Sequence, residues 1–217
     1  MKITLDKIIT NKIQEIAEKK KVKGFLKAIK NPRAGDVSII AEIKLVSPSV
    51  GRLGNEETGV RRAKKYESGG ADAVSVVVDK KYFGGSYELL KRIKHTVNLP
   101  ILAKDFIVDP FQIYEAKIIG ASAILLIVKL VNKKTLRKFV ALCQKIEIEP
   151  IVEINDEKDL EKAVATEASI IAVNARNLQT FTLDVDQACR LMEKIPDRFI
   201  KLGFSGIKSS NEVKKYQ

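Results

Sequence analysis

The chain has 217 residues, of which 45% are apolar and 30% are charged, and its formal net charge is +12. This balance is typical of a globular protein with a large core and excludes disorder throughout the chain. No apolar run approaches the roughly 18 residues that a membrane span needs, so we expect no membrane partner.

Two further features bear on the compartment. The first residues show neither the apolar segment nor the cleavage site of a secretory signal. The two cysteines, Cys143 and Cys189, lie in no CxxC pair and in no histidine-rich cluster. We therefore expect a reduced cytoplasmic setting, without a disulfide framework or a zinc site.

The positive charge is concentrated at the N-terminus, where residues 1–35 hold ten Lys or Arg against three Asp or Glu. Three interpretations are open: a nucleic-acid surface, steering of an anionic small molecule, or a solvated lysine face. There is no zinc-finger spacing, RRM-like motif or arginine-rich tract. We therefore expect no nucleic-acid partner.

Along the chain, the first element expected is a helix. Leu5, Ile8, Ile9, Ile13 and Ile16 recur at helical spacing and indicate one apolar face. They predict a helical extension over about residues 1–35. Seven runs rich in Ile and Val follow, nearly continuous as in strands buried on both faces: 38–44, 73–79, 100–106, 121–128, 149–155, 169–175 and 199–205.

Helix signals separate these runs. Asp109-Pro110 combines an N-cap with proline at the first helical position, and Gly120 is placed to end that helix. Cap residues with a polar partner three positions later predict three further helix starts, at Asp156, Asp184 and Ser209. A helix that begins near Glu56 is expected to end at Gly69-Gly70.

Alternating strands and helices predict a parallel sheet. The fold class we expect is α/β, a single domain over 1–217 of the TIM (β/α)8 barrel type with an extra N-terminal helix. Seven strands are readable, and we expect the eighth to be missing from this sequence.

Polar side chains recur where the predicted strands end. Side chains two residues apart share a face of a strand, so Glu42 and Lys44 are expected to point the same way. Active groups of these barrels lie at the carboxyl ends of the strands. Four strands ending in ionisable or amide groups favour an active site over scattered structural ion pairs: Glu42, Lys44, Lys104, Glu153, Asn174 and Arg176.

These residue types suit acid–base chemistry on an anionic substrate. A lysine beside carboxylates can act as a general acid near neutral pH, and a glutamate can take a proton back. Ser205-Gly206 follows the seventh strand, where barrel phosphate sites are built from backbone amides. Ser47-Pro48 follows the first strand, as part of the site or as a plain turn.

The same segments carry a family resemblance over about residues 38–207. The sequence resembles indole-3-glycerol phosphate synthase in motifs that occur in that family's order: IIAEIKLVSPSVG, KYFGGSYELL, PILAKDFIVDPFQIYEA, GASAILLIVKLV, EPIVEINDEKDLEKA, NARNLQTFTLD and SGI. The N-terminal helix also fits the family's extra helix.

The resemblance implies a lyase of tryptophan biosynthesis that uses no metal and no organic cofactor. It closes the indole ring of 1-(2-carboxyphenylamino)-1-deoxyribulose 5-phosphate, with loss of CO₂ and water. The implied partner is this small anionic phosphosugar, and we expect a monomer or weak homo-oligomer.

Residue roles follow from the resemblance alone. Lys104 is implied to protonate the ribulose carbonyl, and Glu153 to assist proton transfer in the dehydration. Lys44 would support acid chemistry and hold a substrate anion. The resemblance gives Glu42 and Asn174 an orienting role, and gives the remaining positions to binding: Arg176 and Ser47 to anions, Phe83, Phe106, Pro48 and Leu125 to the aromatic ring, and Ser205 and Gly206 to the phosphate.

The sequence departs from the family pattern at three places besides the eighth strand. Leu45 follows the lysine of EIK where the family usually has arginine, and Val77-Val78-Asp79 replaces LTD or LTE. Phe204 replaces the glutamate of the SES-Gly motif. These departures keep an alternative open, a weak or inactive barrel remnant acting as a binding or partner subunit. A phosphoribosylanthranilate isomerase would instead need an Asp/Cys pair at strand ends, where neither cysteine lies.

Overall fold

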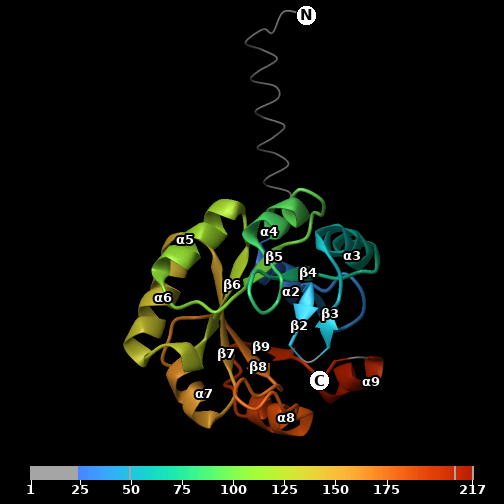
Figure 1. The fold of residues 1–217 in the computed structure, drawn as a ribbon. Helices are drawn as coiled ribbons and strands as arrows, with labels where there is room; N and C mark the ends of the chain where they lie inside the picture. The colour runs from blue at the N-terminus through green and yellow to red at the C-terminus, as the bar shows by residue number, and fades with distance from the viewer. Residues whose placement is uncertain (1–23, 49, 208, 217) are drawn as a thin grey trace, which may run out of the picture. The chain divides into compact units, whose positions relative to one another are not determined.

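The computed structural model describes residues 24–48, 50–207 and 209–216, in which strands and helices alternate (Figure 1). The predicted apolar helical face between Leu5 and Ile16 lies outside the described residues. The chain forms two compact units, Met1–Leu102 with Gly120–Ser122, and Ala103–Ile119 with Ala123–Gln217. The expectation of a single domain stays a prediction.

All seven predicted strands are present, and their order is that of the sequence, β1-β4-β5-β6-β7-β8-β9. Their α/β alternation confirms the fold class. Each lies within a predicted apolar run: β1 (Ile40–Ile43), β4 (Ala73–Val77), β5 (Ile101–Lys104), β6 (Ala123–Ile127), β7 (Glu149–Ile154), β8 (Ile170–Asn174) and β9 (Ile200–Phe204).

In the first unit, β1 pairs parallel with β4, and β4 is buried along its whole length. Its helices are α2 (Phe25–Lys30), α3 (Glu56–Ser68) and α4 (Tyr87–Lys94). The apolar face of α4 supplies Leu89, Leu90 and Ile93, none of which is exposed. Burying three such side chains contributes roughly 1.5–3 kcal/mol each before entropy is counted.

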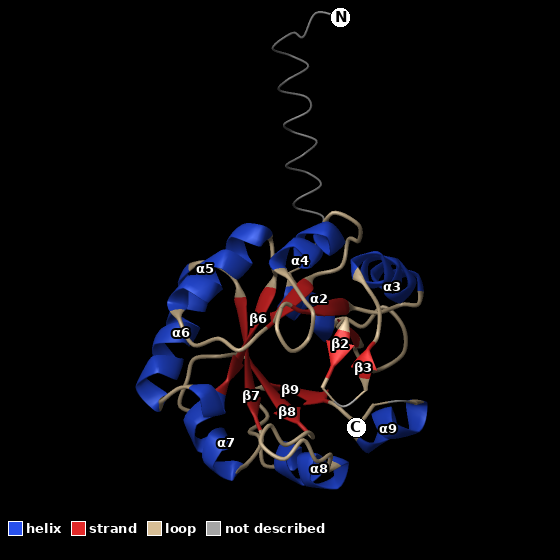
Figure 2. Ribbon diagram, viewed as in Figure 1, coloured by secondary structure: helices blue, strands red, loops and turns tan. Residues whose placement is uncertain are grey.

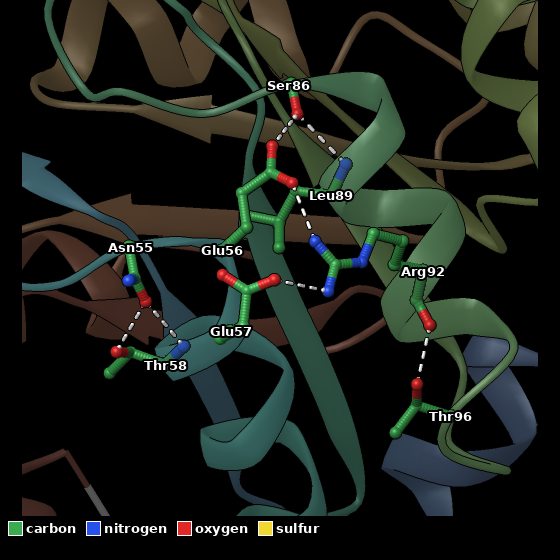
Figure 3. Close-up of polar contacts among 8 residues, drawn as sticks. All are labelled: Asn55, Glu56, Glu57, Thr58, Ser86, Leu89, Arg92 and Thr96. Carbon is green, nitrogen blue, oxygen red and sulfur yellow. Dashed lines mark hydrogen bonds and ion pairs between the residues drawn. The ribbon is translucent and has the colours of Figure 1, made fainter.

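A polar cluster joins α3 to α4 (Figure 3). The Arg92 guanidinium donates to Glu56 Oε2 at 2.8 Å and to Glu57 Oε1 at 3.0 Å. Ser86, the N-cap of α4, accepts from Leu89 N and donates to Glu56 Oε1. The start of α3 thereby lies beside α4. Hydrogen bonding to Arg92 lowers the pKa of the Glu57 carboxyl.

In the second unit, β6, β7, β8 and β9 pair parallel in that order. Figure 2 shows α7 and α8 on one side of β7 and β8. The helical elements of this unit are α5 (Pro110–Ile119), the 3₁₀ turn η1 (Val128–Leu130), α6 (Lys133–Lys145), α7 (Glu157–Ala163), α8 (Val185–Glu193) and, after the last strand, α9 (Ser210–Lys215).

The predicted helix starts agree with the structure, with one difference in chemistry. Asp156 and Asp184 accept from the backbone N–H three positions on, as N-caps do. Ser209 precedes α9, but its hydroxyl donates to the Glu212 carboxylate and makes no cap bond to the backbone. α5 begins at Pro110 after Asp109, as predicted.

The sequence pattern did not predict a short antiparallel pair of strands after β1. It consists of β2 (Val46–Ser47) and β3 (Gly51–Arg52). Gly51 has φ +80°, in the left-handed region that glycine tolerates and that tight hairpins need. Two residues per strand carry too little alternation for a sequence pattern to reveal.

Among the described helices, none combines the length and the apolar character that crossing a bilayer requires.

Candidate functional site

In the first unit, the polar end of β1 forms an ion pair. Lys44 Nζ lies 2.9 Å from Glu42 Oε1, with side-chain exposures of 36% and 30%. The predicted common face of these two residues is therefore confirmed. The intervening Ile43 is fully buried, because alternation along the strand sends it to the core.

Ser47, Pro48 and Phe83 are associated with the hairpin of the same unit. Ser47 is buried on β2, whereas Pro48 is exposed. Val46 N donates to Phe83 O at 2.9 Å, so the loop that carries Phe83 lies against β2. That loop passes so close to β4 that a Cβ on Gly85 would lie 2.0 Å from Val77 O.

An Asp79 carboxylate shapes this loop. Its Oδ1 accepts from Tyr82 N at 2.7 Å and from Phe83 N at 3.1 Å. Asp79 is the retained acidic residue of the departure at 77–79. In this structure it fixes the backbone beside Phe83, which accounts physically for an acidic residue at the end of β4.

In the second unit, Glu153 and Asn174 are buried together at the ends of β7 and β8. Their exposed fractions are 1% and 9%. Asn174 Nδ2 donates to Glu153 Oε1 at 3.2 Å. Burying an ionisable carboxyl is expensive unless donors compensate it, and this amide is one such donor.

Asn174 is the centre of a larger network. Its Oδ1 accepts from Ser205 Oγ at 2.8 Å and from Arg176 N at 3.0 Å. A carboxylate offers only acceptors, so the amide nitrogen faces Glu153 and the amide oxygen faces the two donors. The predicted residues Glu153, Asn174 and Ser205 are therefore brought together.

Ser205 and Gly206 both have left-handed backbone, with φ of 69° and 76°. Non-glycine residues rarely adopt this region, and its strain is often found at functional sites. A Cβ on Gly206 would lie 2.6 Å from Val185 Cγ2, so only glycine fits there.

Lys104 ends β5, and its ammonium lies over an aromatic ring. Lys104 Nζ is 5.2 Å from the centroid of Phe204, which pairs in register with Asn174. The Phe204 departure thus places a ring against the predicted general acid. Phe106, two residues on, is 38% exposed.

The structure also gives the surroundings of two other predicted binding residues, Arg176 and Leu125. The Arg176 guanidinium donates to Phe181 O at 2.9 Å within its own loop. Leu125 is 1% exposed on β6, where it belongs to the core of the unit.

Sequence reasoning missed Asn155. It follows β7, and its Nδ2 donates to Asn174 O at 2.8 Å and to Arg176 O at 3.0 Å. The next residues include Asp156, the N-cap of α7, which is paired with Lys129 at 3.0 Å. Asp159 lies in the first turn of α7, and burial raises the pKa of its carboxyl. A polar residue just after a strand was the available signal, but its partners are 19 and 21 residues away.

The cysteines lie on helices. Cys143, on α6, is buried, and that burial raises the pKa of its thiol to about 12. Cys189, on α8, is half-buried and donates to Lys215 O. Neither ends a strand, as the sequence predicted. Within the described residues, no group of three or more His, Cys, Asp or Glu side chains could hold a metal ion.

Comparisons with known proteins agree with these features. A sequence model described as indole-3-glycerol phosphate synthase matches residues 3–217. The indole-3-glycerol phosphate synthase of Petrotoga mobilis is 38% identical over 214 residues, covering 96% of this chain and 84% of the relative. That of Acetivibrio thermocellus is 40% identical over 190 residues, covering 88% and 72%.

Solved structures show the same fold at low identity. N-acetylmannosamine-6-phosphate 2-epimerase from Clostridium perfringens matches with a TM-score of 0.63 at 14% identity, over 82% of this chain and 81% of that one. The 3-keto-L-gulonate-6-phosphate decarboxylase from Vibrio cholerae matches with a TM-score of 0.62 at 14% identity, over 83% and 84%.

Proposed function

The chain belongs to the indole-3-glycerol phosphate synthase family, and we propose that it carries out that family's ring closure with the polar groups that end its strands. It is a carboxy-lyase of tryptophan biosynthesis with a phosphosugar substrate. The proposed reaction converts 1-(2-carboxyphenylamino)-1-deoxyribulose 5-phosphate into indole-3-glycerol phosphate, CO₂ and water.

Lys104 is the proposed general acid for the first bond formation. The ring carbon that bears the carboxylate attacks the ribulose carbonyl, and the Lys104 ammonium gives its proton to the carbonyl oxygen. CO₂ then leaves, and the electrons of its bond to the ring restore aromaticity. The position of Lys104 Nζ over the Phe204 ring supports this role, because an aromatic face holds an ammonium without taking its proton.

Glu153 is the proposed base for the dehydration. Glu153 takes a proton from the neighbouring carbon, whose electrons form the indole double bond, and passes that proton to the new hydroxyl, which leaves as water. A carboxylate is one of the side-chain groups that act as general bases in such proton transfers. Asn174 orients this carboxylate through its bond at 3.2 Å.

Further residues are proposed to bind the anionic and aromatic parts of the substrate. Lys44, oriented by Glu42, holds a substrate anion, and Ser47 and Arg176 bind anionic groups. The proposed phosphate contacts are backbone amides at Ser205 and Gly206, and the proposed apolar walls are Phe83, Phe106, Pro48 and Leu125. We further propose a cytoplasmic monomer or weak homo-oligomer without a nucleic-acid partner.

The observation that carries this proposal is the buried network of Glu153, Asn174 and Ser205. Three predicted site residues, two on β7 and β8 and one just after β9, meet there in a single donor–acceptor arrangement. Structural ion pairs would not require a buried carboxylate, an amide and a strained serine together.

Replacement of the proposed acid tests the assignment. Lys104→Ala should lower kcat for indole formation by about 10²–10⁴-fold, the usual contribution of a positioned acid. Lys129→Ala is the matched control, because Lys129 is paired with Asp156 and has no proposed role in the reaction. A Lys104→Ala variant within threefold of the parent would rule out Lys104 as the acid.

A further inference from the structure

The side-chain amide of Asn155 donates two hydrogen bonds to backbone carbonyls. They belong to Asn174 and Arg176, the residues on either side of Ala175, at 2.8 and 3.0 Å. Asn155 lies two residues after Glu153, so it extends from the end of β7 to the end of β8. Its own backbone N–H donates to Asp159 Oδ2 at 3.1 Å, in the first turn of α7.

The carbonyls held by Asn155 flank the segment that carries the Asn174 amide. That amide must present nitrogen to Glu153 and oxygen to Arg176 N, and a half-turn of the amide would break both bonds. Fixing the main chain on both sides of Ala175 limits the tilt of the Asn174 side chain. The orientation of Glu153 is thereby coupled to Asn155.

The strand itself does not depend on this side chain. Ala175 N donates to Phe204 O at 2.9 Å, and Ala175 O accepts from Asp184 N at 2.9 Å. Val173 and Asn174 are also paired in register with β9. Removing the Asn155 donors therefore frees two carbonyls and leaves the pairing of β8 intact.

Within the described residues, the Asn155 side chain also leaves one buried acceptor unsatisfied, which an apolar residue at this position would not do. Its Oδ1 is buried and has no hydrogen-bond partner within the part of the chain that the structure describes. Leaving a buried acceptor unsatisfied lowers stability, and an apolar side chain of the same shape would not incur this loss. The retained amide is explained by its two donors.

We propose that Asn155 is a positioning residue for ring closure, because its amide holds the Asn174 and Arg176 carbonyls and so keeps the Asn174 amide aligned on Glu153. This inference rests on the proposed roles of Glu153 and Asn174. Asn155 itself acts only through Asn174.

The first test is Asn155→Leu, which keeps the size of the side chain and removes both donors. We expect kcat for indole formation to fall roughly ten- to 100-fold, as small misplacements of catalytic groups do, with KM within twofold of the parent. Asn155→Gln keeps two donors and should recover part of the lost kcat. If Asn155→Leu does not fold, Asn155→Ser removes the second donor with a smaller change.

Asn132→Ala is the matched control. Asn132 is also an asparagine bonded to the backbone, since its Oδ1 accepts from Thr135 N at the start of α6. The Asn132→Ala substitution should lower the melting temperature and leave kcat unchanged. A fall in kcat that tracks melting temperature in both variants would overturn the positioning role.

A double-mutant cycle separates this inference from the proposed function. If Asn155 acts through Asn174, Asn155→Leu with Asn174→Ala should be no slower than Asn174→Ala alone. Losses that multiply would overturn the inference and leave the role of Asn174 standing. An Asn174→Ala variant with the parent kcat would instead overturn the proposed role of Asn174, and this inference with it.

Discussion

Each unit contains one carboxylate of the predicted site, and the surroundings of these two carboxylates are opposite in character. In the first, Glu42 meets the Lys44 ammonium at 2.9 Å, and about a third of each side chain is exposed. In the second, Glu153 is 1% exposed and meets a neutral amide, Asn174, at 3.2 Å. One carboxylate belongs to an ion pair in contact with water, and the other to a network that water scarcely reaches.

The two surroundings suit different chemical roles. An exposed ion pair contributes little to stability, and its charge remains available to solvent and to an anionic ligand. A buried carboxylate is strongly affected by each donor around it, because the interior has a low dielectric constant. The contrast is consistent with the proposed roles, anion binding for Lys44 and proton transfer for Glu153.

The largest expected effect comes from neutralising each carboxylate in turn. Glu153→Gln should lower the rate of indole formation by about 10²–10⁴-fold, because the proposed base is lost. Glu42→Gln should lower it by about fivefold or less, the rate equivalent of an interaction worth up to ~1 kcal/mol. Release of CO₂ and growth of indole fluorescence, followed separately, measure both.

Glu153→Gln has a second signature. Because ring closure and decarboxylation precede the dehydration, this variant should release CO₂ faster than it forms indole. If Glu153→Gln and Glu42→Gln slowed CO₂ release and indole formation by equal factors, the contrast between the two carboxylates would be contradicted.

The next largest expected difference between the two sites is in the free energy of unfolding. Asn174→Ala removes a donor from Glu153 and acceptors from Ser205 and Arg176 N, so the free energy of unfolding should fall by about 1–3 kcal/mol for each buried group left unsatisfied. Lys44→Met breaks an exposed pair and should cost less than about 1 kcal/mol. Urea titrations of both variants check this, and equal losses would contradict it.

Ionic strength sharpens the contrast further. Between roughly 10 and 150 mM salt the Debye length shrinks from about 30 to 8 Å, so kcat/KM for an anionic substrate should fall about two- to tenfold. Lys44→Met should show a shallower dependence. A flat response of the parent would mean that the excess of Lys and Arg is only a solvated face.

The smallest effect concerns exposed charge within the second unit. Lys133 and Lys134 occupy the first turn of α6, against the helix dipole, and with Arg137 and Lys138 they line a hollow of about 440 Å³. Lys134→Glu should raise stability by about 0.3–1 kcal/mol. Lys145→Glu in the last turn is the control and should lower it. Thermal unfolding of both variants decides, and a loss in Lys134→Glu would contradict the dipole argument.

The sequence predicts the fold well because two-sided burial leaves a strong local pattern. The Ile- and Val-rich runs at 121–128 and 169–175 contain β6 and β8, each buried along its whole length. Helix starts at Asp156 and Asp184 were predictable because a cap involves residues three apart. The β2–β3 hairpin was not, since its two-residue strands carry no periodicity.

In the candidate site, too, contacts between residues close in sequence were predictable and contacts between distant residues were not. The Glu42–Lys44 pair was predictable because strand alternation puts residues two apart on one face. The partners of Asn174 lie 21 and 31 residues away, and only the sheet register brings them together. The partners of Asn155 are similarly distant in sequence, and the ring of Phe204 beside Lys104 is seen only in the structure.

The most direct test of the central claim is the product stoichiometry of the unaltered chain. With 1-(2-carboxyphenylamino)-1-deoxyribulose 5-phosphate at low ionic strength, indole formation is followed by fluorescence while released CO₂ is counted in the same sample. The account predicts both products in equal amounts, without added metal or cofactor. Consumption of substrate with no indole, or indole without an equal amount of CO₂, would contradict it.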